Sequence, residues 1–293
     1  VYATFPNGGF IKKWDPTGRL LTIWETLLEP DHSTGGSHAG PLAVGGGYLY
    51  VGNSDGTYGF IQKYTLDGVY DTAWGGGGYL PPPYLPQEMR YITGVMVAPD
   101  GDIWAADGVT HYVTRWTDTG GYISSVGSGN PDPGPYSPYD PYPTDISFPF
   151  GMAIGADGFL YVADTHFQCI SKWTTDGTFV EIIVRSELWS FANRPQYVRS
   201  AKELFFDSSG HFCVSCTGGF KRFETYAAWV WEGFFTPLVW EHPYLDGFPI
   251  VSPMCVKNDL VYWANNLINP FVNPVRTVYK NTLTGTLLLQ FPC

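Results

Sequence analysis

Short apolar runs, each about the length of one β-strand, follow one another along the chain with turn residues between them. The clearest example is the stretch 151–180, where ADG, DTHFQC and TTDG separate four runs: Met152–Ile154, Phe159–Ala163, Ile170–Trp173 and Phe179–Ile182. Asp-Gly between apolar runs is a strong hairpin signal, because glycine readily adopts the positive φ that a tight turn needs. The pattern predicts a small four-stranded antiparallel sheet, which needs copies of itself to bury both of its faces.

Those copies are present along the whole chain. An apolar residue, any residue, a Lys or Arg and an aromatic residue precede a turn that ends in glycine, as in Ile170–Trp173 followed by TTDG. The aromatic position falls at Trp14, Tyr64, Trp116, Trp173 and Phe223, with Lys280 as its last equivalent. The spacings are 50, 52, 57, 50 and 57 residues, and repetition at such a period indicates a solenoid, a propeller or an array.

Each motif follows a run that ends in Asp or Asn, as in Tyr161-Val-Ala-Asp164, and before that run lies a Gly-apolar segment with a turn such as ADG. This order resembles the NHL repeat, most closely over 151–177 and 94–120. The resemblance implies an all-β fold, a six-bladed β-propeller of four-stranded antiparallel blades. It also implies a single domain over residues 1–293, with blades at about 1–25, 40–75, 92–127, 149–184, 201–235 and 252–293.

The first blade has no candidate for its innermost strand. Val1–Phe5, Phe10–Trp14 and Leu20–Trp24 match the second, third and fourth strands of the other blades. An empty inner place leaves backbone groups unpaired, and each buried one costs about 1–3 kcal/mol. We expect the place to be filled by sequence preceding Val1, which also explains a start without Met, or by a strand from another copy or subunit. The alternative is a blade of only three strands, with its inner edge shielded by side chains such as Phe5 and Trp24 or wetted by the channel.

Composition and charge narrow the classes of partner. Aromatic residues make up 17% of the chain and charged residues only 15%, and the net charge is −11. Nucleic acid is excluded as an expected partner, because binding to phosphates needs a basic surface. No run of about 18 apolar residues occurs, so the sequence predicts no membrane-spanning segment.

The connections between strands differ in length, and the difference predicts a working face. First-to-second turns are tight, whereas the links from each fourth strand to the next first strand are long, roughly 25–40, 75–92, 127–148, 184–200 and 228–251. In an antiparallel blade alternate connections emerge on the same side, so all the long links crowd one face of the disc. We call this the long-loop face and expect it to bind ligands, since binding residues concentrate on loops held by a rigid scaffold.

The long links are rich in Pro, Tyr and Trp. Pro stiffens a loop and Tyr and Trp offer large contact areas, a combination that favours binding. The predicted binding residues on the long-loop face are Tyr79, Tyr84, Tyr136, Tyr139, Tyr142, Trp229, Trp231 and Trp240. The alternative for the cluster at 229–240 is that its rings fold back over the disc as a buried lid.

Candidate metal ligands are few. Some NHL propellers are lyases that hold zinc with His residues at the starts of inner strands, but only His38 lies near such a start here, while His111 and His166 occupy matching loop positions. The recurring Asx residues at strand ends are expected to hydrogen-bond loop backbone rather than to bind an ion. These residues are Asn53, Asp107, Asp164 and Asn265. The sequence therefore predicts no metal site and no cofactor.

Two further sets of residues carry expectations of structure. The repeated Lys or Arg of the third strand is expected to form a solvated face. Of five cysteines, at least one must lack a partner within the chain. In oxidising surroundings we predict a disulfide between Cys169 and Cys216, at equivalent loop-side ends of the fourth and fifth blades, or between Cys213 and Cys255, in neighbouring strands of the fifth and sixth. A metal role for Cys213 and Cys216 is disfavoured because no second pair or nearby His completes a site.

Taken together, these features favour a non-enzymatic binding or assembly module. We expect it to be extracellular, on a cell or virion surface, and to take a protein or glycan ligand, or other copies of itself, on its long-loop face. The alternative hypothesis is an extracellular metal-dependent lyase or hydrolase with its site in the central channel.

Overall fold

The computed structural model describes residues 1–5, 9–26, 38–54, 58–75, 84–129, 146–185, 201–208, 210, 212–216, 219–223, 238–241, 254–257, 260–265, 277–282 and 287–292. Beyond residue 216 this description is almost entirely one of backbone. Strands and turns make up the described ranges, and no helix is found in them. Accordingly, these ranges contain no helix of the length and apolarity that crossing a membrane requires.

The strands form antiparallel sheets, each built from strands that follow one another in the chain. Three sheets of four strands have the order β4(His38–Gly45)-β5(Tyr48–Ser54)-β6(Gly59–Thr65)-β7(Tyr70–Gly75), β8(Ile92–Val97)-β9(Ile103–Asp107)-β10(Val113–Trp116)-β11(Tyr122–Val126), and β12(Pro149–Ile154)-β13(Leu160–Asp164)-β14(Cys169–Trp173)-β15(Phe179–Arg185). Two more have the order β16(Leu204–Phe206)-β17(Phe212–Cys216)-β18(Gly219–Phe223)-β19(Leu238–Glu241) and β20(Met254–Lys257)-β21(Leu260–Asn265)-β22(Thr277–Thr282)-β23(Leu287–Pro292).

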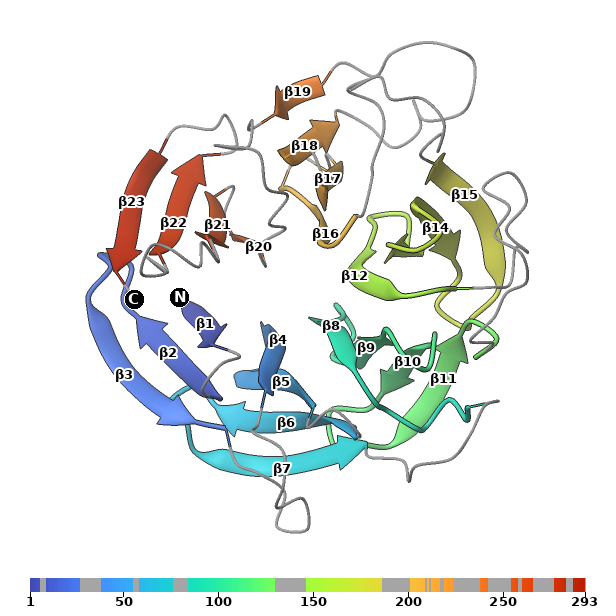
Figure 1. The fold of residues 1–293 in the computed structure, drawn as a ribbon, viewed down its shortest axis with the longest axis horizontal. Helices are drawn as coiled ribbons and strands as arrows, with labels where there is room; N and C mark the ends of the chain where they lie inside the picture. The colour runs from blue at the N-terminus through green and yellow to red at the C-terminus, as the bar shows by residue number, and fades with distance from the viewer. Residues whose placement is uncertain are drawn as a thin grey trace, which may run out of the picture.

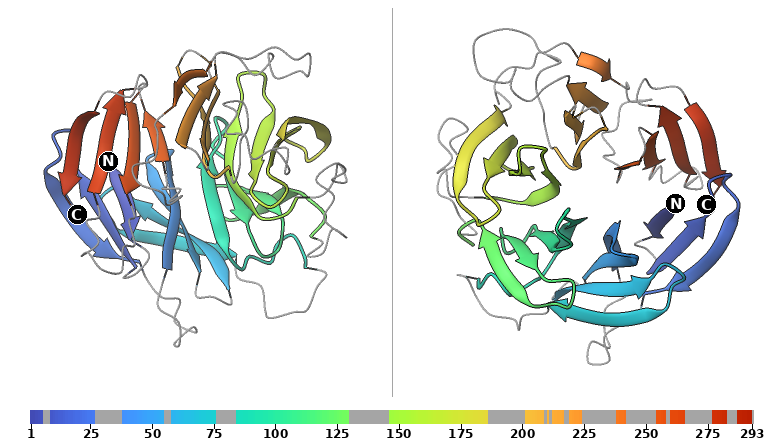
Figure 2. Two further views of the ribbon diagram at one scale, coloured as in Figure 1. Left: turned by 45° about the horizontal axis from the view of Figure 1, so that its top comes forward. Right: turned by 180° about the vertical axis from the view of Figure 1, so that it is seen from behind.

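The sheets are arranged as a ring around a common centre (Figure 1). In each four-stranded sheet the strand that comes first in the chain lies nearest the centre, and the last lies at the rim. The tilted and reversed views in Figure 2 show the same circular arrangement of upright sheets. This is the architecture of a β-propeller, and we refer to each sheet as a blade.

The first blade has three strands, β1(Tyr2–Phe5), β2(Phe10–Trp14) and β3(Leu20–Glu25). In β1, Tyr2 is paired with Lys13, just as Tyr161 of β13 is paired with Lys172. The register therefore makes β1 the equivalent of a second strand, as predicted. Within the described ranges β2 is the only strand that pairs with β1. What occupies its inner side stays a prediction.

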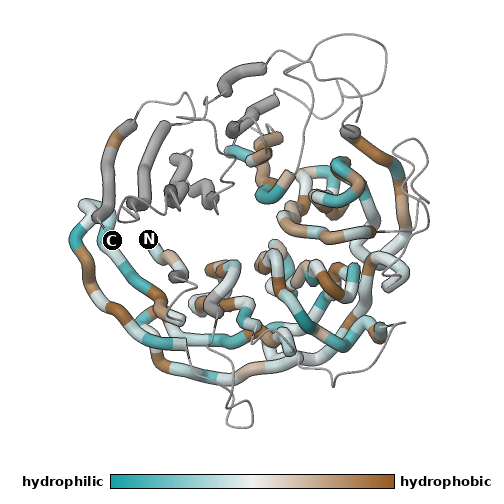
Figure 3. Tube along the Cα trace, in the orientation of Figure 1, coloured by the Kyte–Doolittle hydropathy of each residue, from teal (hydrophilic) through white to brown (hydrophobic). Residues whose placement is uncertain are grey.

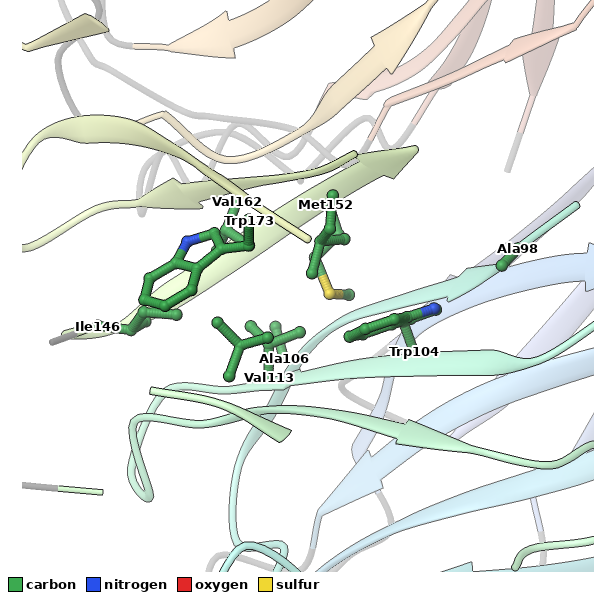
Figure 4. Packing of buried hydrophobic residues seen from close by; sticks show 10 residues of the cluster. Ala98, Trp104, Ala106, Val113, Ile146, Met152, Val162 and Trp173 are labelled. Carbon is green, nitrogen blue, oxygen red and sulfur yellow. The ribbon is translucent and has the colours of Figure 1, made fainter. Parts of the chain in front are cut away.

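Alternation along the strands builds a hydrophobic core between each pair of neighbouring blades from the first to the fifth, the part of the ring whose side chains are described. Figure 3 shows apolar and polar residues interleaved along the inner strands. Between the blades β8–β11 and β12–β15, Trp173 and Met152 face Trp104 and Val113, and all four side chains are buried (Figure 4). A ring of similar blades thus buries both faces of each sheet, which one small sheet cannot do alone.

The repeated Lys or Arg of the third strand joins neighbouring blades at three junctions, and the expectation of a solvated face is wrong. Lys13 Nζ donates to the carbonyl of Leu66 (2.9 Å), Lys63 Nζ to that of Asp118 (3.1 Å), and Arg115 Nη1 to that of Thr175 (3.2 Å). Each acceptor lies in the third-to-fourth turn of the next blade. These turns cover the cations, so the side chain of Lys63 is only 6% exposed.

The glycine that ends each of these turns explains why the motif repeats. Gly68 and Gly120 have φ of +89° and +88°, a region that glycine adopts without strain. A Cβ at Gly68 would lie 2.8 Å from Trp24 of the preceding blade, and one at Gly120 would lie 2.9 Å from Trp74. Turn and cation together fasten the second, third and fourth blades each to the blade before it.

We expect Lys63→Met to lower the free energy of unfolding by about 1–3 kcal/mol, because it removes a buried ammonium together with its hydrogen bond to Asp118 and its ion pairs with Asp71 and Asp118. This ammonium also lies 4.1 Å from the centroid of the Tyr48 ring. Arg19→Met is the matched control, since Arg19 forms an ion pair with Asp15 on the surface and such pairs contribute about 0–1 kcal/mol. Chemical denaturation measures both; equal effects would contradict the proposed role of Lys63.

Candidate functional site

The described part of the long-loop face lies where the inner strands begin. The connections from Gly75 to Ile92, from Val126 to Pro149 and from Arg185 to Leu204 end there. The loops between second and third strands reach the same face, because the second strand runs antiparallel to the first. Residues 84–91, 108–112, 146–150 and 201–203 therefore form the candidate site at the long-loop end of the inner strands, a region that we call the channel mouth.

Of the predicted binding residues, Tyr84 is the one whose side chain is described. The guanidinium of Arg90 lies 4.5 Å from the centroid of its ring, and the hydroxyl of Tyr112 donates to its carbonyl (3.4 Å). The backbone of Trp240 lies in β19. The other predicted residues fall outside the described residues: Tyr79, Tyr136, Tyr139, Tyr142, Trp229 and Trp231.

Asp107 fixes one segment of the channel mouth. One oxygen of its carboxylate accepts hydrogen bonds from the backbone N–H groups of Arg90 and Tyr91, and the other accepts them from Val109 and Thr110. It thereby joins the start of inner strand β8 to the loop after β9. This is the backbone-bonding role expected for the recurring Asx residues.

Asp164 repeats this arrangement in the next blade. It accepts hydrogen bonds from the N–H groups of Ser147 (2.6 Å) and Phe167 (2.7 Å). Burial raises the pKa of Asp164 to about 7, against the opposing effect of these donors. In the second blade, Asn53 accepts a hydrogen bond from Ser54 N–H (2.9 Å). Asn265 lies at the end of β21, where only the backbone is described.

An apolar and aromatic surface lies beside these anchors. Tyr91 is 46% exposed and Val109 is 36% exposed, although both are large apolar residues. The ring centroid of Phe148 lies 6.5 Å from that of Tyr91 and 5.5 Å from that of Phe150. We call Tyr91, Val109, Phe148 and Phe150 the mouth patch. Phe148 and Phe150 are half-buried, so the patch combines exposed and half-buried apolar side chains, a combination found at binding surfaces.

Two charged residues adjoin the mouth patch. Lys202 Nζ lies 4.0 Å from the centroid of the Phe150 ring, and burial lowers the pKa of this ammonium. Glu203 follows it at the position that Gly94 and Gly151 occupy in their inner strands. Burial raises the pKa of Glu203 to about 8, and the positive charge of Lys202 opposes the shift only in part. Perturbed carboxyl groups of this kind cluster at functional sites.

The two loop histidines are each held through Nδ1, but by different kinds of partner. Phe148 N–H donates to His111 Nδ1 (3.1 Å), and Ser147 Oγ lies 3.0 Å from His166 Nδ1. The side chain of His38 is not among those described. Across the described residues, no three side chains of His, Cys, Asp or Glu gather as a metal site would require.

Of the two predicted disulfides, one is not formed and the other involves a side chain that is not described. Cys169 and Cys216 are buried, but Cys216 belongs to the core that contains Ile170, whereas Cys169 alternates with Ile170 and so lies on the opposite face of β14. The structure does not bring this pair together. Cys213 is buried in β17, and the side chain of Cys255 in β20 lies outside the description, so that pair stays a prediction.

Comparison with solved structures places the fold among β-propellers. The nidogen of a nidogen/laminin complex shares 13% identity, with a TM-score of 0.62 over 100% of this chain and 92% of the other. Virginiamycin B lyase from Staphylococcus aureus shares 15% identity, with a TM-score of 0.53 over 100% and 80%. A gluconolactonase from Xanthomonas campestris shares 17% identity, with a TM-score of 0.50 over 78% and 69%.

These neighbours include enzymes and a protein in a complex with another protein, so they do not select a function. No protein-family model matches the chain, and no curated protein matches it. At identities below one fifth the likeness concerns the fold, and one fold hosts many functions. The chain is an all-β protein with the architecture of a β-propeller.

Proposed function

We propose that this chain is a six-bladed propeller of the NHL type that acts as a non-enzymatic binding module through its long-loop face. The observation that carries the proposal is the mouth patch, where Tyr91, Val109, Phe148 and Phe150 form an apolar surface around the start of the inner strands. Asp107 holds the backbones of Tyr91 and Val109, and Asp164 holds that of Ser147 next to Phe148, so little conformational freedom remains to be lost on binding.

The ligand is a protein, a glycan or another copy of the chain. Aromatic rings held on a rigid scaffold offer contact area to either class of macromolecule. A net charge of −11 disfavours nucleic acid. The low charged fraction of 15% and the Pro- and Tyr-rich links favour an extracellular place, on a cell or virion surface. The nidogen neighbour, seen in a complex with laminin, supports a protein ligand by analogy of fold.

The test replaces rings of the mouth patch and measures two kinds of binding. We expect the double variant Tyr91→Ala, Phe150→Ala to weaken binding on a glycan array, or self-association in sedimentation velocity, by about tenfold or more. Removing Tyr136, Tyr139 and Tyr142 together should act in the same direction. Tyr70→Ala is the matched control, because Tyr70 is 38% exposed but lies on an outer strand.

The midpoint temperature of thermal unfolding distinguishes rings that contact a ligand from rings that only pack against the propeller. Binding that survives the Tyr91 and Phe150 changes, together with a lowered midpoint, would mean that the rings only pack against the disc. An equal loss of binding in Tyr70→Ala would place the contact at the rim instead of the channel mouth.

The second candidate is a metal-dependent lyase or hydrolase acting in the channel. Glu203 and Lys202 favour it, because a carboxyl group that stays protonated near neutral pH can act as a general acid. The described residues do not assemble a set of metal ligands, so no step is assigned to a metal. Turnover of gluconolactone or virginiamycin B by the wild-type chain, abolished in Glu203→Gln, would replace the binding proposal with this one.

A further inference from the structure

Phe148 lies at the centre of the mouth patch, and its backbone conformation is unusual. Its φ is +61°, a left-handed conformation that a bulky residue rarely adopts. His111, which accepts a hydrogen bond from the Phe148 N–H, also has a φ of +61°. Two strained residues are therefore joined by one hydrogen bond, and the ring they position lies between Tyr91 and Phe150.

This hydrogen bond requires a particular protonation state of His111. An imidazole nitrogen accepts a hydrogen bond only when it carries no proton, so His111 must be neutral with its proton on Nε2. Protonation would place an N–H on Nδ1, directly facing the N–H of Phe148. Two donors cannot bond to each other, and the contact would be lost.

The groups around His111 favour the neutral form. Burial lowers the pKa of His111 below its usual value of 6.5, and the nearby imidazole of His166 lowers it further. The carboxylate of Asp107, four residues earlier in the same loop, acts in the opposite direction without overcoming burial. The Phe148 contact is therefore intact at neutral pH and is exposed to loss only in acid.

We propose that His111 makes the mouth patch sensitive to pH: protonation of its imidazole breaks the Phe148 hydrogen bond, releases the left-handed backbone there and weakens ligand binding. The release of Phe148 follows from the loss of its hydrogen bond with His111, whereas the weaker binding of a ligand rests on the proposed binding function. His166 is held by Ser147 Oγ, which can either donate or accept, so protonation of His166 does not impose the same loss.

Two variants of His111 distinguish the effect of its hydrogen bond with Phe148 from the effect of its protonation. In His111→Asn the side-chain Oδ1 can take the place of Nδ1 as acceptor, and Asn tolerates positive φ better than most residues. This variant keeps an acceptor but cannot be protonated. His111→Leu fills a similar space without an acceptor at any pH. His166→Asn is the control for loss of a neighbouring imidazole.

The primary measurement is amide hydrogen exchange at Phe148, expressed as a protection factor so that the intrinsic effect of pH cancels. We expect wild-type protection to fall about tenfold as His111 titrates, matching the loss of one hydrogen bond. Protection should remain constant in His111→Asn, be low throughout in His111→Leu and follow wild type in His166→Asn. Nuclear magnetic resonance of labelled histidine follows the His111 titration independently.

Unchanged wild-type protection across a complete His111 titration would overturn the proposal, as would an equal fall in His111→Asn. If His111→Leu does not fold, the comparison of wild type with His111→Asn still decides. Neither measurement uses a ligand, so a failure here is distinct from a failure of the proposed function. Once a glycan or a self-association has been found, acid should weaken it in wild type and not in His111→Asn.

Discussion

Replacing Trp173 with alanine is expected to lower the free energy of unfolding by about 3–5 kcal/mol, the largest single effect we predict. The indole is buried in the core between the blades β8–β11 and β12–β15 and makes an edge-to-face contact with Phe179 at 5.2 Å. Its Nε1 also donates to Ser171 Oγ (2.8 Å). Because the cavity would lie between two blades, neither blade can close it alone.

Guanidinium chloride denaturation measures this effect, with two variants as controls. Ile123→Ala removes an apolar side chain that is 42% exposed on an outer strand and should change stability by about 0.5 kcal/mol or less. Ser171→Ala removes the partner of the indole and isolates the hydrogen bond. A loss in Trp173→Ala no larger than that in Ile123→Ala would mean that this core does not hold the two blades together.

The second large effect is expected for Gly151→Ala, where an added methyl group meets the backbone of the next blade. A Cβ on Gly151 would lie 2.1 Å from the carbonyl oxygen of Lys202 and 2.7 Å from the Cα of Glu203. Two inner strands would have to separate, and overpacking of this kind costs about 1–3 kcal/mol or more. Urea denaturation should show the loss.

Gly121→Ala is the control for the intrinsic effect of replacing glycine. Its Cβ would lie 3.0 Å from Thr117 Oγ1, a side-chain atom that can move aside, and its φ is not in the left-handed region. We expect this variant to be close to wild type in stability. Equal stabilities for Gly151→Ala and wild type would refute the close packing of the inner strands.

The fold was predictable because it is repeated. The run that ends at Asp164 and the motif that ends at Trp173 recur in most blades, and each copy supports the assignment of the others. The bonding of Asp107 to loop backbone followed from the same recurrence. The role of Lys63 did not follow, because alternation in one strand says which way a side chain points but not that the turn of the next blade covers it.

The candidate site was harder to predict. Tyr91 and Phe148 are separated by 57 positions in the chain and come together only because consecutive inner strands converge at the channel mouth. Glu203 did leave a signal, since it stands where Gly94 and Gly151 stand in their repeats. The positive φ of His111 and of Phe148 left none, because nothing in their residue types requires it.

The hydrogen bonds that Lys13, Lys63 and Arg115 form with the next blade also affect where this protein can change length. An insertion in a third-to-fourth turn, such as the turn ending in Gly68, would disturb two blades. It would change the blade that contains the turn, and it would break the hydrogen bond that Lys13 of the preceding blade donates to this turn. The glycines of the first-to-second turns are not packed against a neighbouring blade, since a Cβ on Gly101 or Gly158 would meet nothing within 4 Å. Added segments, whether acquired in evolution or grafted by design, are therefore tolerated better in the first-to-second turns than in the third-to-fourth turns, although both kinds of turn lie on the face opposite the long links.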